Sequence, residues 1–274
     1  MLQEKYEHLK RILRDLESVI VAFSGGIDST LLLKVSLDTL GPENVLAITA
    51  NSETYPQSEL KAAVEVANDL GAPHKIIDTS ELNIPGYSNN DKDRCYYCKN
   101  GLFEEINPIL DQIGFKNIVY GLIADDINEY RPGARAAVEQ GVRGPLQEAG
   151  LYKDEIRELA KILNLSNWDK PSLACLSSRI AYGEKISIQK LTKIELSERY
   201  LLDLGVKQVR VRTHGDIARI EVEPEDMNFI IQHNKAISEK LQIFGYKFVS
   251  LDLLGYKSGS MNKALSKTLQ PNHP

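Results

Sequence analysis

The stretch "SVIVAFSGGIDST" (residues 18–30) decides the fold. Residues 18–23 form a short apolar run rich in β-branched side chains, which predicts a buried strand. The "SGGIDS" segment (24–29) is a glycine turn, and the apolar pattern of 30–41 predicts a helix that ends at Gly41. A buried strand that passes through a glycine turn into a helix is typical of the units from which α/β domains are built.

The same pattern continues along the first half of the chain. Further strands are predicted at 44–50, 74–78 and 117–121, with a helix at 56–71. Strands that are nearly all apolar and alternate with helices indicate a parallel sheet covered on both faces. We therefore expect the α/β fold class, with a doubly wound parallel sheet over about residues 1–165. The polar segment 79–94 is longer than a plain connection needs, which favours a functional or mobile loop.

The pattern changes after the turn at 181–185, and a second, smaller domain is predicted. We expect a helix, two strands, a helix that begins at Pro224 and a last strand, at 187–204, 207–213, 216–222, 224–242 and 246–253. This order indicates a C-terminal α+β domain over 184–274. Residues 166–183, which contain Cys175, connect the two domains.

Composition narrows the class of protein. The formal net charge of −5 over 274 residues argues against a chain-wide nucleic-acid surface. Apolar runs such as 18–23 are far shorter than the about 20 residues that span a bilayer. The charged N-terminal segment resembles neither a signal nor a transit peptide. We expect a cytoplasmic protein without a membrane or nucleic-acid partner.

The glycine turn predicts an anion-binding loop. Glycines let the backbone approach a ligand, and the amides and dipole of the helix that follows attract phosphate. Ser24, Ser29 and Thr30 add hydroxyl groups. The segment lacks the Gly-Lys-Ser/Thr ending of the Walker loop, which disfavours γ-phosphate transfer. The glycines alone would equally suit a structural turn.

This segment resembles the PP-loop, Ser-Gly-Gly-x-Asp-Ser, of the ATP pyrophosphatase superfamily, whose fold is HUP-like. The resemblance implies ATP and Mg²⁺ as cofactors and cleavage of ATP between its α- and β-phosphates, which adenylates an acceptor oxygen. Asp28 would serve the Mg²⁺–pyrophosphate side, and 48–53 would lie beside the adenine. The cofactor-binding residues implied are Ser24, Gly25, Gly26, Asp28, Ser29 and Thr30.

Later stretches resemble the LarE family over nearly the whole chain. They are "RCYYCKNGLF" (94–103), "GLIADDINEYRPG" (121–133), "PLQEAGLYKDEIRELAK" (145–161), "NWDKPSLACLSSRIAYG" (167–183) and "VRVRTHGDIARIE" (209–221). The family comprises ATP-dependent sulfur transferases for the nickel-pincer nucleotide of lactate racemase. The resemblance implies that carboxylates of pyridinium-3,5-biscarboxylic acid mononucleotide become thiocarboxylates. The C-terminal "GYKSGSMN" (255–262) departs from the family, because Lys257 stands where an Arg is frequent.

The resemblance also implies site residues. Cys175 matches the sulfur-bearing cysteine and Glu198 an active-site acid. Arg210 and Arg212 match substrate-binding positions, and their alternation on a strand places them on one face, where paired guanidinium groups suit phosphate and carboxylates. A solvated strand face is the alternative. Arg131, just beyond the fourth strand, could face phosphate or belong to a turn.

The cysteines leave several possibilities open. In the well-known form of the family, the cysteine matching Cys175 gives up its sulfur and becomes dehydroalanine. Here Cys95 and Cys98 accompany it, and three thiolates are one short of the four that hold a [4Fe–4S] cluster, so we predict a cluster whose uncovered iron accepts sulfide from a donor. Zinc with a fourth ligand, a sacrificial Cys175 with spectator Cys95 and Cys98, and three small buried side chains are the alternatives.

Rival functions remain within and outside this enzyme class. A tRNA-thiolating PP-loop enzyme usually carries an added RNA-binding domain and a basic surface. An amide-forming PP-loop enzyme of the NAD or GMP synthetase type would not need the cysteines. A non-catalytic nucleotide- or metal-binding protein is opposed by the intact motif at 24–30. Members of the LarE family are oligomers, so a homo-oligomer is expected.

Overall fold

The computed structural model describes residues 1–128, 131–171, 174–257 and 259–261. The chain divides into two compact units. The first unit comprises Met1–Ile84 and Cys95–Leu173, and the second comprises Pro85–Arg94 and Ala174–Pro274. The segment Pro85–Arg94 therefore belongs to the second unit although the first unit surrounds it in sequence. Each unit is described by itself.

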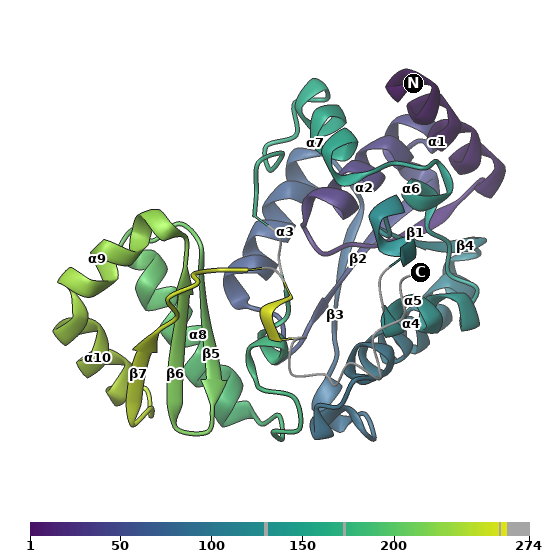
Figure 1. The fold of residues 1–274 in the computed structure, drawn as a ribbon. Helices are drawn as coiled ribbons and strands as arrows, with labels where there is room; N and C mark the ends of the chain where they lie inside the picture. Colours follow the sequence, from purple (N-terminus) through teal and green to yellow (C-terminus); the bar gives the residue numbers. More distant parts are fainter. Residues whose placement is uncertain (129–130, 172–173, 258, 262–274) are drawn as a thin grey trace. The chain divides into compact units, whose positions relative to one another are not determined.

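The first unit is built on a four-stranded parallel sheet with strand order β3-β2-β1-β4 (Figure 1). The strands are β1 (Val19–Ala22), β2 (Val45–Asn51), β3 (His74–Asp78) and β4 (Asn117–Tyr120). All four lie within one or two residues of their predicted positions. The predicted α/β class with a parallel sheet is confirmed.

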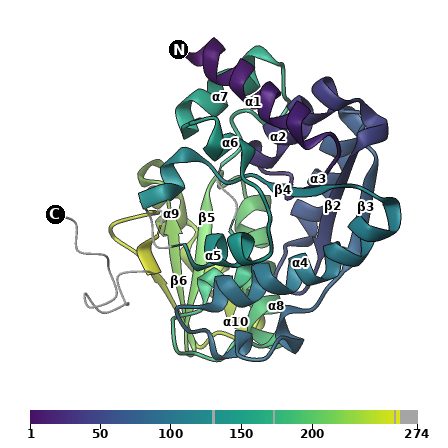
Figure 2. The same ribbon diagram turned by 90° about the vertical axis from the view of Figure 1, so that its right-hand side faces the viewer.

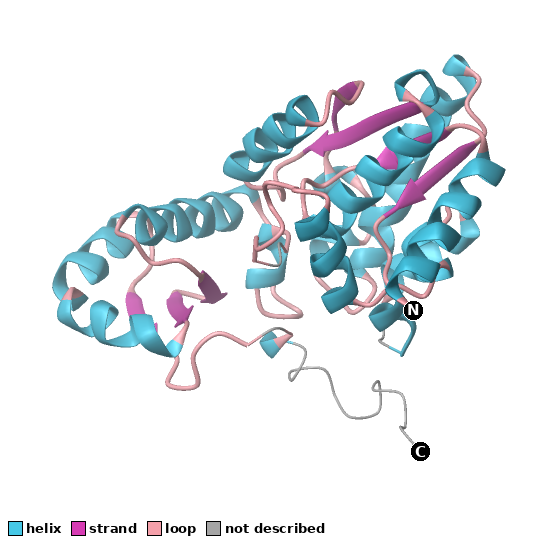
Figure 3. Cartoon of the chain, turned by 90° about the horizontal axis from the view of Figure 1, so that it is seen from above, coloured by secondary structure: helices cyan, strands magenta, loops and turns pink. Residues whose placement is uncertain are grey.

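Helices cover both faces of this sheet (Figures 2 and 3). Val19 and Val21 belong to one apolar core and Ile20 belongs to another, because successive side chains of a strand point to opposite faces. The first core includes residues of α1 (Leu2–Leu16), α2 (Ile27–Leu40), α3 (Gln57–Asp69), α6 (Pro145–Glu148) and α7 (Lys153–Ile162). The second includes residues of α4 (Arg94–Ile113) and α5 (Pro132–Glu139).

The segment predicted as a long loop, 79–94, is structured. It holds two short 3-10 turns, Glu81–Asn83 and Tyr87–Asn89, and α4 begins at its last residue. Helix α4 was not predicted from the sequence, although Cys95 and Cys98 both lie in its first turns. No helix in the described part of the chain is long and apolar enough to cross a membrane.

The second unit has a three-stranded sheet with order β5-β6-β7. Strands β5 (Val209–His214) and β6 (Ile217–Val222) are antiparallel, and β7 (Phe248–Leu251) lies parallel to β6. The helices are α8 (Ile188–Asp203), α9 (Met227–Gln232) and α10 (Asn234–Ile243). The prediction of one helix over 224–242 was wrong, because the helix is interrupted at His233, between α9 and α10. The side chain of Asn234 donates to the Ile231 carbonyl (2.6 Å), a local bond that competes with a continuous helix.

The two faces of this second sheet differ in character. Val209, Val211 and Ile220 pack with α8, α9 and α10 in one apolar core. Side chains on a strand alternate between faces, so the opposite face carries Arg210 and Arg212 of β5 and Arg219 and Glu221 of β6. Arg210 and Arg212 are nevertheless buried, which excludes the solvated strand face considered from the sequence.

Candidate active site

The loop between β1 and α2 has the local geometry of an anion site. Gly25 has a φ of +63°, a conformation that L side chains rarely adopt, and Gly26 is the N-cap of α2. The hydroxyl of Ser29 donates to the Gly26 carbonyl (2.9 Å) and lies 3.2 Å from the Ser24 hydroxyl. The loop is therefore folded on itself at the positive end of a helix dipole, where phosphate binds favourably.

Neighbouring elements hold this loop from outside. The Tyr55 hydroxyl donates to the Ser24 carbonyl (2.7 Å), and a Cβ on Gly25 would lie 2.8 Å from the Ala63 Cα. The Asn167 amide donates to the Gly25 carbonyl (3.0 Å) and to the Thr30 hydroxyl (2.9 Å). Thr30 is buried, and its hydroxyl oxygen is the acceptor of the bond from Asn167. The loop's shape is thus fixed by contacts from several segments of the first unit.

Asp28 forms an ion pair with a lysine that the sequence analysis did not single out. The Lys153 ammonium, at the start of α7, lies 2.7 and 2.8 Å from the two Asp28 carboxylate oxygens. The backbone amide of Lys153 donates to Asp125 (2.8 Å), so both ends of the residue are held. A cation therefore already faces the carboxylate predicted to serve Mg²⁺.

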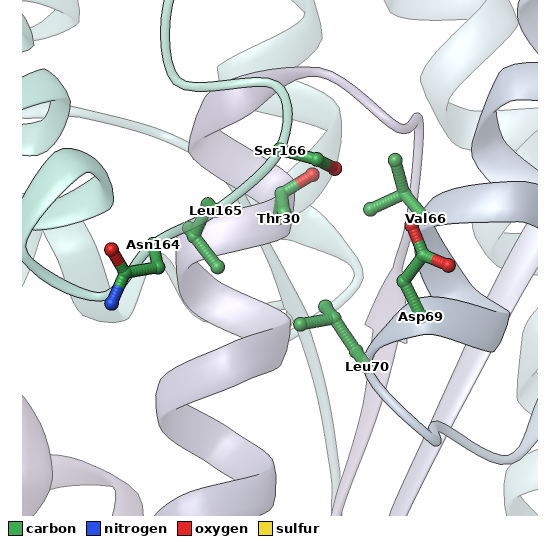
Figure 4. Close-up of a pocket in the computed structure, with 7 residues that line it drawn as sticks. All are labelled: Thr30, Val66, Asp69, Leu70, Asn164, Leu165 and Ser166. Atoms are coloured by element: carbon green, nitrogen blue, oxygen red, sulfur yellow. The ribbon is translucent and has the colours of Figure 1, made fainter.

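A small pocket of about 170 Å³ opens beside the first turn of α2 (Figure 4). It is lined by Thr30, Val66, Asp69, Leu70, Asn164, Leu165 and Ser166. The segment after α7 therefore lies close to the start of α2, near the contact that Asn167 makes with the loop.

Other predicted residues of the first unit lie in separate places. Arg131 forms an ion pair with Asp126 (2.6 Å) and is about half exposed. Cys95 is exposed, and the half-buried Cys98 donates its thiol hydrogen to the buried Glu81 carboxylate (3.9 Å). Within the described residues of either unit, no three His, Cys, Asp or Glu side chains are grouped so as to hold a metal ion.

In the second unit, Cys175 lies beside a buried ion pair. Arg179 donates through Nε and Nη2 to the two Glu198 carboxylate oxygens, at 2.9 and 3.0 Å. Its Nη1 donates to the carbonyls of Ala174 (2.7 Å) and Cys175 (3.0 Å). Burial alone would lower the pKa of Arg179, but the Glu198 carboxylate outweighs it and the pKa is raised. Arg179 therefore stays charged next to the cysteine.

The strand arginines complete a cationic cluster. Arg212 donates to the fully buried Glu221 carboxylate (2.9 Å) and to the Ser178 carbonyl (3.2 Å). Burial lowers the pKa of Arg210, the nearby Arg179 lowers it further, and Glu198 opposes both effects. A bound anion would favour the charged form of Arg210, which burial and Arg179 disfavour. The second unit thus brings together four predicted residues, namely Cys175, Glu198, Arg210 and Arg212.

The peptide that leads into Cys95 is held firmly within the second unit. Arg94 donates to the Asn90 side chain (2.5 Å) and to the Ser177 carbonyl (3.1 Å). The Asn90 amide in turn donates to the Ala181 carbonyl (2.8 Å), and the Tyr87 hydroxyl donates to Ser177 (2.8 Å). The residue before Cys95 is therefore bonded to a residue that closely follows Cys175 in sequence.

Several residues that shape the site were not predicted from the sequence, namely Lys153, Asn167, Glu221 and Glu81. Lys153, Asn167 and Glu221 lie in stretches that carried the family resemblance, but their partners are distant in sequence. Glu221 could have been found, because it lies on a predicted strand that also carries an arginine. A charge buried on a strand is costly unless it is paired, so a carboxylate there indicates an ion pair.

Comparison with known proteins agrees with this geometry. The model of the NAD synthase family matches residues 2–93. Pyridinium-3,5-bisthiocarboxylic acid mononucleotide synthase of Lactiplantibacillus plantarum is 41% identical over 97% of this chain and 96% of its own length. An uncharacterized protein of Synechocystis is 41% identical over 97% of this chain and 100% of its own length. An NH(3)-dependent NAD(+) synthetase of Methanococcoides burtonii is 40% identical over 24% of this chain and 26% of its own length.

The parallel sheet, the loop between β1 and α2 and the NAD synthase match define an enzyme of the PP-loop class. Identity over nearly the full length of both proteins specifies the family within that class. The chain belongs to the LarE family.

Proposed function

We propose that this enzyme uses Mg-ATP to convert a carboxylate of pyridinium-3,5-biscarboxylic acid mononucleotide into a thiocarboxylate, on the route to the nickel-pincer nucleotide of lactate racemase. The carboxylate oxygen attacks the α-phosphorus of ATP and pyrophosphate leaves. A sulfur nucleophile then attacks the acyl carbon and AMP leaves with the oxygen. Atoms and electrons balance without an oxidant. The observation that carries the proposal is the 41% identity, over 97% of this chain, to an enzyme named pyridinium-3,5-bisthiocarboxylic acid mononucleotide synthase.

The first unit supplies groups suited to the adenylation step. The amides of the loop at Gly25 and Gly26 would hold phosphate oxygens, and Asp28 would bind Mg²⁺ once its contact with Lys153 (2.7 Å) opens. In this proposal Arg131 is a further phosphate ligand that exchanges its partner Asp126 for substrate. Preorganised positive charge favours the pentavalent phosphorus in which negative charge accumulates.

The second unit supplies groups suited to the substrate and to sulfur. Arg210 and Arg212 would bind the phosphate and carboxylates of the mononucleotide, and Tyr256, whose ring centroid lies 5.4 Å from the Arg210 guanidinium, borders the same cluster. Arg179 would hold the Cys175 segment in place through its bond to the Cys175 carbonyl (3.0 Å) and would offer a permanent charge to an anionic substrate. Glu198 fixes Arg179 and thereby acts as a positioning residue in this proposal.

The type of ligand supports the proposal of an iron–sulfur cluster, although the three cysteine side chains are not grouped together among the described residues. None of the three cysteines forms a disulfide, and cysteine sulfur is the usual ligand of such a cluster. Cys95, Cys98 and Cys175 would hold a [4Fe–4S] cluster, which when bound would present an exogenous sulfide to the acyl adenylate. The bonds from Arg94 and Tyr87 to Ser177 support this reading, because they tie the peptide before Cys95 to the turn after Cys175.

A sacrificial route is the second candidate, and the exposure of Cys175 favours it. Cys175 is partly exposed, so its thiolate could attack the acyl adenylate directly. The resulting thioester would lose its Cα proton, and cleavage of the Cβ–S bond would leave dehydroalanine and the thiocarboxylate. Cys95 and Cys98 would then have no part in sulfur transfer.

Iron content and protein mass distinguish the two routes. The protein is purified anaerobically, reconstituted with iron and sulfide, and compared with Cys95→Ser, Cys98→Ser and Cys175→Ser. About four irons per chain with a broad visible band, lost in each variant, would support the cluster. A colourless protein whose Cys175 peptide loses the elements of hydrogen sulfide after turnover would establish the sacrificial route. A protein that neither binds iron nor loses sulfur, and forms no thiocarboxylate, would overturn both.

A further inference from the structure

Asn167 bridges the two sides of the loop between β1 and α2. Its Nδ2 lies 3.0 Å from the carbonyl oxygen of Gly25, before the helix, and 2.9 Å from the hydroxyl of Thr30, in the first turn of α2. An amide nitrogen carries two hydrogens, so both acceptors are served at once. Asn167 is only 7% exposed, and all three residues belong to the first unit.

The orientation of the Asn167 amide is fixed by its surroundings. The Gly25 carbonyl oxygen accepts hydrogen bonds and cannot donate one, so the nitrogen of the amide must face it. The Asn167 Oδ1 atom is buried without a hydrogen-bond partner among the described residues. The two acceptors of the Asn167 nitrogen therefore hold the amide in one orientation.

The bond to Gly25 controls the direction of a peptide plane. The Gly25 carbonyl and the Gly26 amide belong to one planar trans peptide and point in opposite directions. By holding the carbonyl on one side, Asn167 aims the Gly26 amide toward the other, where the Ser24 hydroxyl lies 3.4 Å away. A carbonyl turned into the loop would repel phosphate, whereas an amide attracts it. The positive φ of Gly25, +63°, is what permits this orientation.

We propose that Asn167 is a positioning residue for the nucleotide phosphates, which acts through the Gly25–Gly26 peptide and presets the loop for anion binding. The inference rests on the proposed use of ATP and adds to it a residue outside the Ser-Gly-Gly-x-Asp-Ser segment. The stretch that carries Asn167 also carries Lys170, whose ammonium pairs with Glu59 on α3 at 2.6 Å. Lys170 therefore attaches the same segment to the first unit by a different contact, which makes it a matched control.

Binding measurements on the full chain test the role of Asn167. The probes are pyrophosphate and Mg-ATP, which carry phosphates, and adenosine, which carries none. Asn167→Leu has nearly the same shape without the donors, and Thr30→Val removes one of the two acceptors. We expect Asn167→Leu to lower the affinity for pyrophosphate and Mg-ATP by about tenfold, which is the effect of losing one positioned hydrogen bond. The affinity for adenosine should not change. Thr30→Val should lower these two affinities for the phosphate probes by a smaller factor, and Lys170→Met should bind all three probes as the wild type does.

Other outcomes overturn the inference. If Asn167→Leu binds pyrophosphate as the wild type does, or weakens adenosine equally, Asn167 has no specific part in phosphate binding. If Asn167→Leu fails to fold, Asn167→Asp takes its place, because it keeps the shape of the side chain but has no donor for the Gly25 carbonyl, and an unaltered pyrophosphate affinity in that variant overturns the inference. A wild-type protein that binds neither phosphate probe would refute the use of ATP as well. Loss of phosphate binding in Asn167→Leu without sulfur transfer by the wild type would uphold this inference and refute the sulfur chemistry.

Discussion

Glu198 receives two parallel hydrogen bonds from Arg179, at 2.9 and 3.0 Å, in the buried interior of the second unit. The same carboxylate accepts a bond from the Val211 amide (2.9 Å) on β5, which is an edge strand of the second sheet. Because Arg179 also binds the carbonyl of Cys175, Glu198 links the strand that carries Arg210 and Arg212 to the cysteine segment. These contacts suit a residue that holds Arg179 and β5 in place better than a residue that transfers a proton.

Replacing Glu198 with Gln should destabilise the protein strongly. The change leaves the buried Arg179 charge without its counter-ion, and breaking such a pair costs about 3 kcal/mol or more. Urea unfolding measures the difference. Glu239→Gln, at an exposed position of α10, is the control and should change the free energy of unfolding by less than about 0.5 kcal/mol. Equal unfolding free energies for the two variants would contradict the account.

Two glycines with nearly equal backbone angles separate conformational strain from close packing. Gly25 has a φ of +63° and Gly71 a φ of +65°, so alanine carries a similar backbone cost of about 1–2 kcal/mol at both. At Gly25 the new Cβ would lie 2.8 Å from the Ala63 Cα, whereas at Gly71 it meets open space. We expect Gly25→Ala to lose about 1–3 kcal/mol more than Gly71→Ala. Thermal unfolding of both variants checks this, and equal losses would show that Ala63 yields freely.

The stability of the first unit should depend on the protonation of His74. Burial lowers the pKa of His74 below its ordinary value of about 6.5, and its Nε2 lies 2.9 Å from the Thr49 hydroxyl. Neutral His74 therefore contributes stability above pH about 6.5, which is lost as the pH falls through the lower folded pKa. His74→Gln should flatten the fall in unfolding free energy as the pH drops below about 6.5. Parallel pH profiles for the two proteins would refute this.

Asp28 should matter for chemistry rather than for stability. Its ion pair with Lys153 joins side chains that are each 28% exposed, and such pairs contribute at most about 1 kcal/mol. Asp28→Asn should therefore keep the melting temperature nearly unchanged but lose Mg²⁺-dependent release of pyrophosphate. The control is Asp38→Asn, which breaks a comparable pair with Lys34 farther along α2 and should retain activity. Full activity in Asp28→Asn would remove Asp28 from the proposed Mg²⁺ site.

The sequence predicted those features that depend on local pattern. The four strands of the first sheet are short apolar runs with a clear signature, and the glycine turn follows β1 directly. Helix α4 escaped prediction because its start follows a polar stretch, and Gly101 and Pro108 interrupt its periodicity. The bonds from Asn167 to Gly25 and from Lys153 to Asp28 each span more than a hundred residues, so only the folded chain shows them.

Formation of the thiocarboxylate tests the central claim most directly. The reconstituted enzyme is given Mg-ATP, sulfide and pyridinium-3,5-biscarboxylic acid mononucleotide, and the products are identified by mass spectrometry while pyrophosphate is quantified. The account predicts one pyrophosphate for each oxygen replaced by sulfur, and no release when the mononucleotide is omitted. Pyrophosphate released without any sulfur-containing product, or an amide formed when ammonia replaces sulfide, would contradict it and place the enzyme with the amide-forming members of the PP-loop class.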